Sequence, residues 1–161
     1  MSEQNHFKGE VKPLSFEEYS HKYKEFFVMK RENGIIEARL CTDGGPFQHT
    51  WAGHAAWNQA WLDIGNDPEN EVLIIAGTGD KFFTIPFSKN PETRRAEGNW
   101  KNLPFREWST YNMMRQYKES YKNLEHLIFH MDIPTIAVVN GPGSHTEFML
   151  ACDLTLCATD A

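Results

Sequence analysis

The chain has 161 residues, of which 40% are apolar and 13% aromatic, and its formal net charge is −6. This composition is typical of one globular domain with its own core, and it excludes an intrinsically disordered chain. The acidic balance, with no basic stripe, excludes nucleic acid as a partner.

Membrane and redox signals point to the cytoplasm. No stretch approaches the roughly 20 consecutive apolar residues that span a bilayer, so no membrane contact is expected. The three cysteines, Cys41, Cys152 and Cys157, lie in apolar contexts without metal-ligand spacing. Such cysteines indicate free thiols in a reducing compartment.

Apolar runs alternate with helical periodicities and predict an α/β core over residues 25–161, preceded by a polar extension over residues 1–24. The predicted strands are short β-rich runs, at residues 26–29, 35–41, 72–76, 135–139 and 154–158. The predicted helices have apolar residues three or four apart, over residues 16–23, 50–64, 105 to near 134, and 146–152. Two segments are expected to be loops, residues 42–46 and 89–103.

Three of these elements carry the clearest signals. Asn33-Gly34 between the first two strands is a hairpin turn signal. The continuous apolar run at 72–76 predicts a parallel strand buried on both faces. The long helix places six apolar residues on one face: Met114, Tyr117, Tyr121, Leu124, Ile128 and Met131.

The most informative motif joins the fourth predicted strand to the helix after it. The strand ends at Asn140-Gly141, a short Pro-Gly turn follows, and His145 and Glu147 stand where the helix begins. At such a turn the backbone N–H groups point outward and unpaired, which suits a developing negative charge. The motif therefore predicts a site for acid–base chemistry.

Residues 134–153 resemble the crotonase (enoyl-CoA hydratase/isomerase) superfamily, in which a P-x-I-A-A-V-N-G strand, a Gly-rich turn, a Glu and a Cys-Asp pair follow in this order. Residues 71–83 are similar to the family's strand that leads into the first oxyanion-hole segment. The resemblance implies a spiral of ββα units that assembles as a homotrimer or hexamer. Since family domains run to about 250 residues, this chain is expected to be truncated after the active-site helix and the following strand.

His145 separates two branches of that family. Hydratases have glycine there, because a side chain would crowd the thioester. An Asn-Gly-Pro turn followed by His-x-Glu is instead similar to the β-diketone hydrolase (6-oxocamphor hydrolase-like) branch. That branch cleaves a carbon–carbon bond by a retro-Claisen reaction. The resemblance implies no cofactor, and CoA enters only as part of a thioester substrate.

The resemblance assigns roles to five residues. His145 is the expected general acid and base, since an imidazole titrates near neutrality. Glu147 or Asp153 is its expected carboxylate support, although the helix dipole or a structural joint explains these two carboxylates equally well. The N–H groups of Phe87 and Ser144 are the expected oxyanion hole. The segment before Phe87 departs from the family, with proline where glycine is usual.

Four further residues are candidates for substrate contact. His49 and Trp51 follow the second strand, where family members shape the acyl pocket. His126 and His130 lie four apart on the long helix. That is metal-ligand spacing, but the Glu of H-E-x-x-H and a third ligand are missing, so no metal site is expected.

Three functions stay open at this stage. The first is a β-diketone hydrolase, acting on a small-molecule diketone. The second is a hydratase or isomerase acting on an acyl-CoA thioester. The third is a non-catalytic fragment that assembles with partner subunits.

Overall fold

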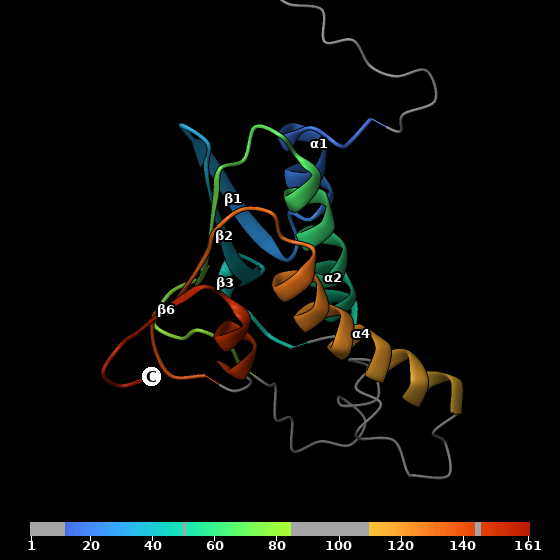
Figure 1. Cartoon of the computed structure of the whole chain (residues 1–161). Helices are drawn as coiled ribbons and strands as arrows, with labels where there is room; N and C mark the ends of the chain where they lie inside the picture. Colours follow the sequence, from blue (N-terminus) through green and yellow to red (C-terminus); the bar gives the residue numbers. More distant parts are fainter. Residues whose placement is uncertain (1–11, 50, 85–109, 144–145) are drawn as a thin grey trace, which may run out of the picture.

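The structure is a computed structural model that describes residues 12–49, 51–84, 110–143 and 146–161 (Figure 1). Its strands are β1 Phe27–Glu32, β2 Ile35–Thr42, β3 Gly45–Pro46, β4 Val72–Gly77, β5 Thr135–Val139 and β6 Leu154–Cys157. Its helices are α1 Phe16–Lys22, α2 Trp51–Asn66, α4 Thr110–Phe129 and the 3-10 helix η3 Thr146–Ala151. The predicted α/β class is confirmed.

The strands form one sheet in the order β1-β2-β4-β5-β6, with β3 beside β2. β1 is antiparallel to β2, whereas β2, β4, β5 and β6 run parallel to one another. The helices α1, α2 and α4 lie together on one face of the sheet (Figure 1). The carboxyl ends of the parallel strands therefore meet at one edge, which is where α/β folds bind ligands.

Two tight turns shape the first half of the sheet. Asn33 and Gly34 have φ values of 50° and 77°, which a two-residue hairpin turn with the twist of its strands requires. The prediction of a loop over residues 42–46 is wrong. Asp43-Gly44 is a second such turn, and it returns the chain to pair β3 with β2.

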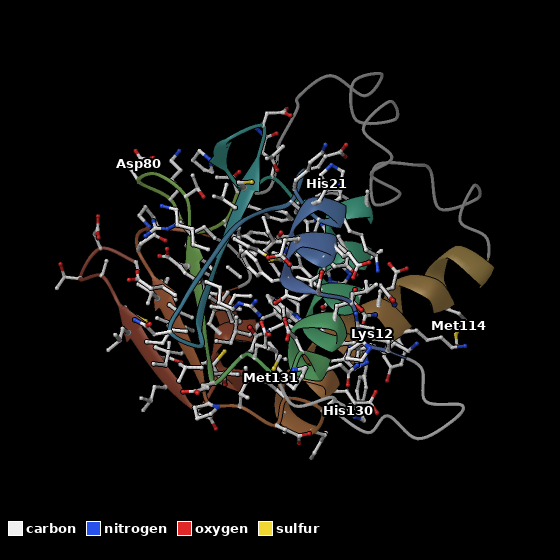
Figure 2. All side chains as sticks on the ribbon, turned by 90° about the horizontal axis from the view of Figure 1, so that it is seen from above. Lys12, His21, Asp80, Met114, His130 and Met131 are labelled. Atoms are coloured by element: carbon white, nitrogen blue, oxygen red, sulfur yellow. The ribbon has the colours of Figure 1, made fainter. Side chains whose placement is uncertain are left out.

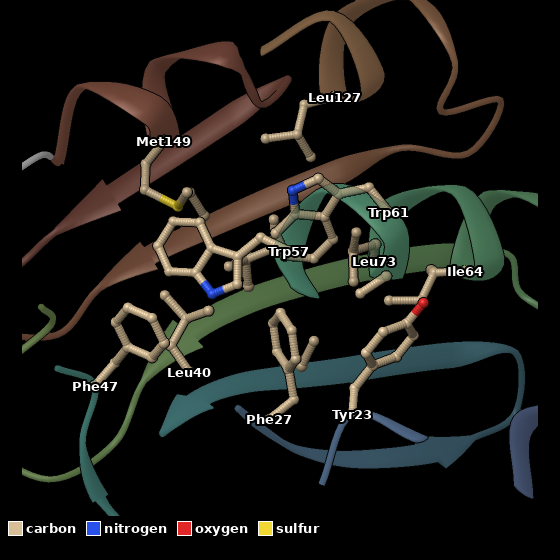
Figure 3. Packing of buried hydrophobic residues seen from close by; sticks show 14 of the residues in the cluster. Tyr23, Phe27, Leu40, Phe47, Trp57, Trp61, Ile64, Leu73, Leu127 and Met149 are labelled. Atoms are coloured by element: carbon tan, nitrogen blue, oxygen red, sulfur yellow. The ribbon is translucent and has the colours of Figure 1, made fainter. Parts of the chain in front are cut away.

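The core lies between α2 and the sheet and is built around two tryptophans (Figure 3). Trp61 packs edge-on against Phe27 of β1, with ring centroids 5.5 Å apart. Trp57 contacts Phe47 and Phe83, at 4.9 and 5.6 Å. Since Phe47 and Phe83 belong to two different loops, Trp57 anchors both loops to α2.

The predicted first helix is confirmed as α1. Ser15 caps it by a reciprocal capping box, in which its side chain accepts from the N–H of Glu18 and its own N–H donates to the Glu18 carboxylate. Tyr19 is fully buried and donates to Asp67 over 3.0 Å. Asp67 also pairs with Arg31 of β1 at 2.8 Å, so one carboxylate joins α1, β1 and the end of α2.

The sheet is covered less completely than the sequence predicts. In β4, Leu73 and Ile75 are buried, but Val72 and Ile74 are only half-buried. The register places Ile74 beside Ile136 and Ile136 beside Leu154, which is 61% exposed. Within the described residues, the face of the sheet opposite the helices is therefore apolar and partly open over β4, β5 and β6, whereas β2 places the ion pair of Glu37 and Arg39 on it.

Two helices also differ from the prediction. Among the α4 residues whose burial is described, Asn123, His126 and Leu127 are buried against the rest of the molecule, whereas most of the predicted apolar face is exposed. Residues 105–109 and the predicted loop at 89–103 lie outside the described residues. The predicted α-helix at 146–152 is the 3-10 helix η3, which rises about 2.0 Å per residue. Among the described residues, no helix combines the length and apolarity that a membrane span needs.

Candidate active site

Three loops meet at the carboxyl edge of the parallel strands. Phe82 of the loop after β4 donates its N–H to the carbonyl of Pro142, over 3.2 Å. On the other side, the N–H of Thr84 donates to Phe47 over 2.8 Å, and the N–H of His49 donates to Thr84 over 2.9 Å. Residues 82–84 therefore run like a short extra strand between the loop that precedes α2 and the turn that follows β5.

Asn140 joins two of these loops through its side chain. The buried N–H of Gly77 donates to Oδ1 of Asn140 over 2.8 Å, and Nδ2 of Asn140 donates to the carbonyl of Gly79, also over 2.8 Å. One amide thus satisfies a donor and an acceptor of the turn that ends β4. The Asn-Gly pair at the end of a predicted strand signals a turn, but it does not reveal this contact 63 residues away along the chain.

Gly143 allows the loops to approach closely. It forms a bridge with Phe83, and a Cβ at position 143 would lie 2.9 Å from both the N and the O of Phe83. Side chains essentially never tolerate such a contact with backbone atoms. The glycine of the Pro-Gly turn in the sequence motif is therefore required for this close packing.

Two histidines lie where these loops meet α2. The rings of His49 and His54 are in edge contact, with centroids 5.4 Å apart. His54 is 4% exposed and also packs against Phe148 of η3 at 6.2 Å, while His49 packs against Phe83 at 5.6 Å. The imidazoles thus lie within an aromatic wall beside the segment that pairs with Gly143.

His54 is not among the residues that the sequence singles out for substrate contact. It precedes Trp57 by three residues and Trp61 by seven, so it lies on the buried face of α2. This spacing in the sequence predicts that the side chain of His54 is buried. Its proximity to His49 depends on how the loop before α2 turns.

Several of the predicted site residues lie outside the described part of the structure. Phe87, Ser144 and His145 belong to residues 85–109 and 144–145. Trp51 begins α2 and Glu147 lies in η3, but their side chains are outside the description. The roles given to these five residues remain predictions.

The side chain of Asp153 forms hydrogen bonds with Thr135. Its Oδ2 accepts from the N–H of Thr135 at 2.7 Å and from the Thr135 hydroxyl at 2.8 Å. These hydrogen bonds, the backbone one foremost, hold the pKa of Asp153 below its ordinary value. Thr135 begins β5, so at about 3.3 Å per residue the carboxylate lies about 13 Å along the strand from its other end. These contacts join the starts of β5 and β6. His145 lies outside the described residues, so the role of Asp153 as its support stays a prediction.

His126 is on α4 and His130 directly follows its last residue, and the two differ in setting. Nδ1 of the buried His126 lies 2.8 Å from the carbonyl oxygen of Asn58, so this nitrogen carries the proton, because a carbonyl only accepts. His130 is half exposed, with Nε2 3.9 Å from Glu125. Among the residues described, no three metal-binding side chains gather around one point.

Comparisons with known proteins add to this geometry. No family model matches the chain. The chain is 32% identical, over 108 residues and 66% of its length, to carnitinyl-CoA dehydratase from Salmonella enteritidis, of which this covers 36%. Carnitinyl-CoA dehydratase from Salmonella gallinarum matches to the same extent.

Solved structures share the fold. A beta-diketone hydrolase from the cyanobacterium Anabaena sp. PCC 7120, bound to (S)-3-oxocyclohexyl acetic acid, matches with a TM-score of 0.66 and 32% identity. The match covers 87% of this chain and 51% of that one. Enoyl-CoA hydratase from Bacillus halodurans matches with a TM-score of 0.59 and 15% identity, over 84% of this chain and 51% of that one. The chain thus spans about half the length of these solved proteins.

Proposed function

Because this chain belongs to the crotonase superfamily, we propose that it is part of a hydrolase that cleaves a β-diketone between its two carbonyl groups. The proposal is supported by the 32% identity to the beta-diketone hydrolase of known structure. It is also supported by His145, which follows Gly143 by two residues where hydratases of the family have glycine.

The observation that carries the proposal is the pair of imidazoles of His49 and His54 beside the turn at residues 140–143. Gly143 pairs with Phe83, and the ring of Phe83 lies 5.6 Å from His49. The chain therefore leaves the described turn close to this pair, two residues before His145. Imidazoles within an aromatic wall suit an uncharged, compact diketone, because a ring N–H can donate a hydrogen bond to one of its carbonyl groups.

The proposed reaction begins with water. His145 accepts a proton while the water oxygen attacks one carbonyl carbon, and the tetrahedral intermediate then collapses. The bond from that carbon to the central carbon breaks, and its electron pair passes to the second carbonyl as an enolate. The N–H groups of Phe87 and Ser144, with the ring of His49, stabilise the enolate oxygen. His145 returns the proton to the central carbon, which yields a carboxylic acid and a ketone.

A thioester substrate is the alternative. It is favoured by the 32% identity to carnitinyl-CoA dehydratase over 108 residues. In this case Glu147 takes the role of acid and base, and the same N–H groups bind the thioester oxygen. His145 would then have to leave room for the acyl chain.

The test compares two substrates in one preparation, made from the longest product of the gene. Cleavage of a cyclic 1,3-diketone is followed by the loss of its enol absorbance, and hydration of an enoyl-CoA by the loss of its conjugated double bond. We expect diketone cleavage, and we expect His145→Ala to lower kcat/KM by at least about 10²-fold. The control is His21→Ala on the exposed side of α1, which should leave turnover unchanged.

Each outcome either decides between the two functions or excludes a residue from the proposed mechanism. Turnover of the thioester alone would move the assignment to the hydratases. Near-normal diketone cleavage by His145→Ala would remove this histidine from the mechanism. A folded sample that turns over neither substrate would refute the enzymatic proposal for this product.

A further inference from the structure

Helix α4 carries an exposed apolar stripe outside the side that is buried against α2, and Met114 at the start of this stripe also lines a pocket with Ala55 and Asn58 of α2. The buried side, with Asn123, His126 and Leu127, packs against α2 and the core. Figure 2 shows Met114 at the far end of α4, away from the sheet. The stripe consists of four large side chains that are at least half exposed: Met114 at 50%, Tyr117 at 63%, Tyr121 at 61% and Ile128 at 52%.

The spacing of this stripe is that of a coiled-coil seam. With the half-buried Leu124, its members follow one another at intervals of three, four, three and four residues. A seam of this period lets a helix interdigitate with a second helix along its whole length. The rings of Tyr117 and Tyr121 stack with centroids 5.7 Å apart, which makes the middle of the seam a flat apolar surface.

Two charged residues flank the seam on one side. Lys118 directly follows Tyr117, and Glu125 directly follows Leu124, so both occupy the position after the second apolar residue of a heptad. In an antiparallel helix pair these equivalent positions of the two helices face each other. A two-fold axis near Tyr121 would thus place Lys118 of each copy against Glu125 of the other.

A parallel pairing lacks this complementarity. There, Lys118 would face the position just before Met114, which is Met113, and Glu125 would face the position just before Tyr121, which is Ser120. Neither Met113 nor Ser120 carries a charge. The charges therefore select the antiparallel arrangement.

We propose that α4 is a self-association surface, which packs antiparallel against α4 of a second copy of this chain around a two-fold axis. In this pairing Tyr117 lies beside Ile128 of the second copy, and Tyr121 lies beside its Leu124. A closed, isologous contact of this kind limits the assembly to a dimer through this face. A contact of one helix per copy lies near the lower limit of about 1,000 Å² for specific interfaces, so the association depends on concentration.

A second exposed apolar surface serves as the comparison for the proposed surface on α4. Leu154 and Leu156 of β6 are each 61% exposed at the edge of the sheet, and Leu150 of η3 is 76% exposed. Leu154 and Leu156 lie on β6, an element separate from α4, so they can be replaced without altering the proposed seam, whereas η3 contacts α4.

The experiment is sedimentation velocity over a wide range of concentration, with charge-swap variants. Lys118→Glu turns both proposed ion pairs into repulsive pairs, and we expect it to weaken the dimer about tenfold. Glu125→Lys should weaken the dimer to a similar extent, and it also removes the contact with His130. The double variant K118E/E125K should restore the wild-type dimer. Lys122→Glu makes the same charge change on α4 off the seam and should have little effect.

Three results would overturn the proposal. One is a wild-type chain that stays monomeric at the highest concentration reached. Another is a double variant that is as weak as the single ones. The last is a dimer that persists in Lys118→Glu but disappears when Leu154 and Leu156 are replaced by lysine. Circular dichroism of every variant separates lost association from lost folding.

Discussion

Replacing Asn140 by alanine tests whether one side chain holds the candidate active site together. The substitution removes the acceptor of the buried Gly77 N–H and the donor to the Gly79 carbonyl, both at 2.8 Å. A buried donor left without a partner costs about 1–3 kcal/mol, and an ordinary exposed hydrogen bond contributes about 0.5–1.5 kcal/mol. We therefore expect Asn140→Ala to lower the free energy of unfolding by about 2–4 kcal/mol.

The measurement is urea unfolding, followed by tryptophan fluorescence because Trp57 packs against Phe83 of the affected loop. For a chain of this size, the expected loss corresponds to a decrease in Tm of roughly 4–16 °C. Asn140→Asp keeps an acceptor for Gly77 but turns a second oxygen toward the carbonyl of Gly79, so its loss should be intermediate. Asn66→Ala, at an exposed position at the end of α2, is the control.

The reasoning would be refuted by a variant whose stability stays within about 0.5 kcal/mol of the wild type, the usual range for surface substitutions. Hydrogen exchange adds a local test. The amide of Gly77 should lose protection in Asn140→Ala, while that of Tyr19 in α1 should keep it. Equal loss at both amides would indicate global destabilisation instead of a broken loop contact.

Two further predictions concern titrating groups. The pKa of Asp153 is lowered by its bonds to Thr135, so its stabilisation is present above the ordinary pKa of 3.8 and is lost as the pH falls through the lower folded value. Asp153→Ala should lower the free energy of unfolding by about 1–2 kcal/mol at neutral pH. In acid unfolding, the difference in stability between this variant and the wild type should disappear below about pH 4. A difference that stays constant with pH would contradict the prediction. Burial raises the pKa of the Cys152 thiol to about 11, whereas Cys157 is exposed. At mildly alkaline pH, iodoacetamide should therefore alkylate Cys157 well before Cys152, as measured by peptide mass; equal rates would refute the burial of Cys152.

The sequence by itself determined the local elements and the fold family. Asn33-Gly34 predicted the first hairpin because both positions must take positive φ, and few residue pairs do so at low cost. The recurrence of Trp57 and Trp61 at helical spacing predicted α2, since burial against a sheet requires one apolar face. The motif at residues 134–153 predicted the superfamily, because it combines a strand, a turn and a helix start in one short stretch.

Only the tertiary structure decided which of these residues act together. Apolar spacing in α4 indicates a face but not its direction, and packing against α2 selected the side with Asn123 and His126 instead. Asp153 is the last residue of the motif, and pairing of β6 with β5 brings its carboxylate to Thr135, at the start of the same motif. The bridge from Asn140 to Gly77 spans 63 residues, and it forms because parallel pairing brings the ends of β4 and β5 to one edge. Such contacts depend on strand order, which no local pattern encodes.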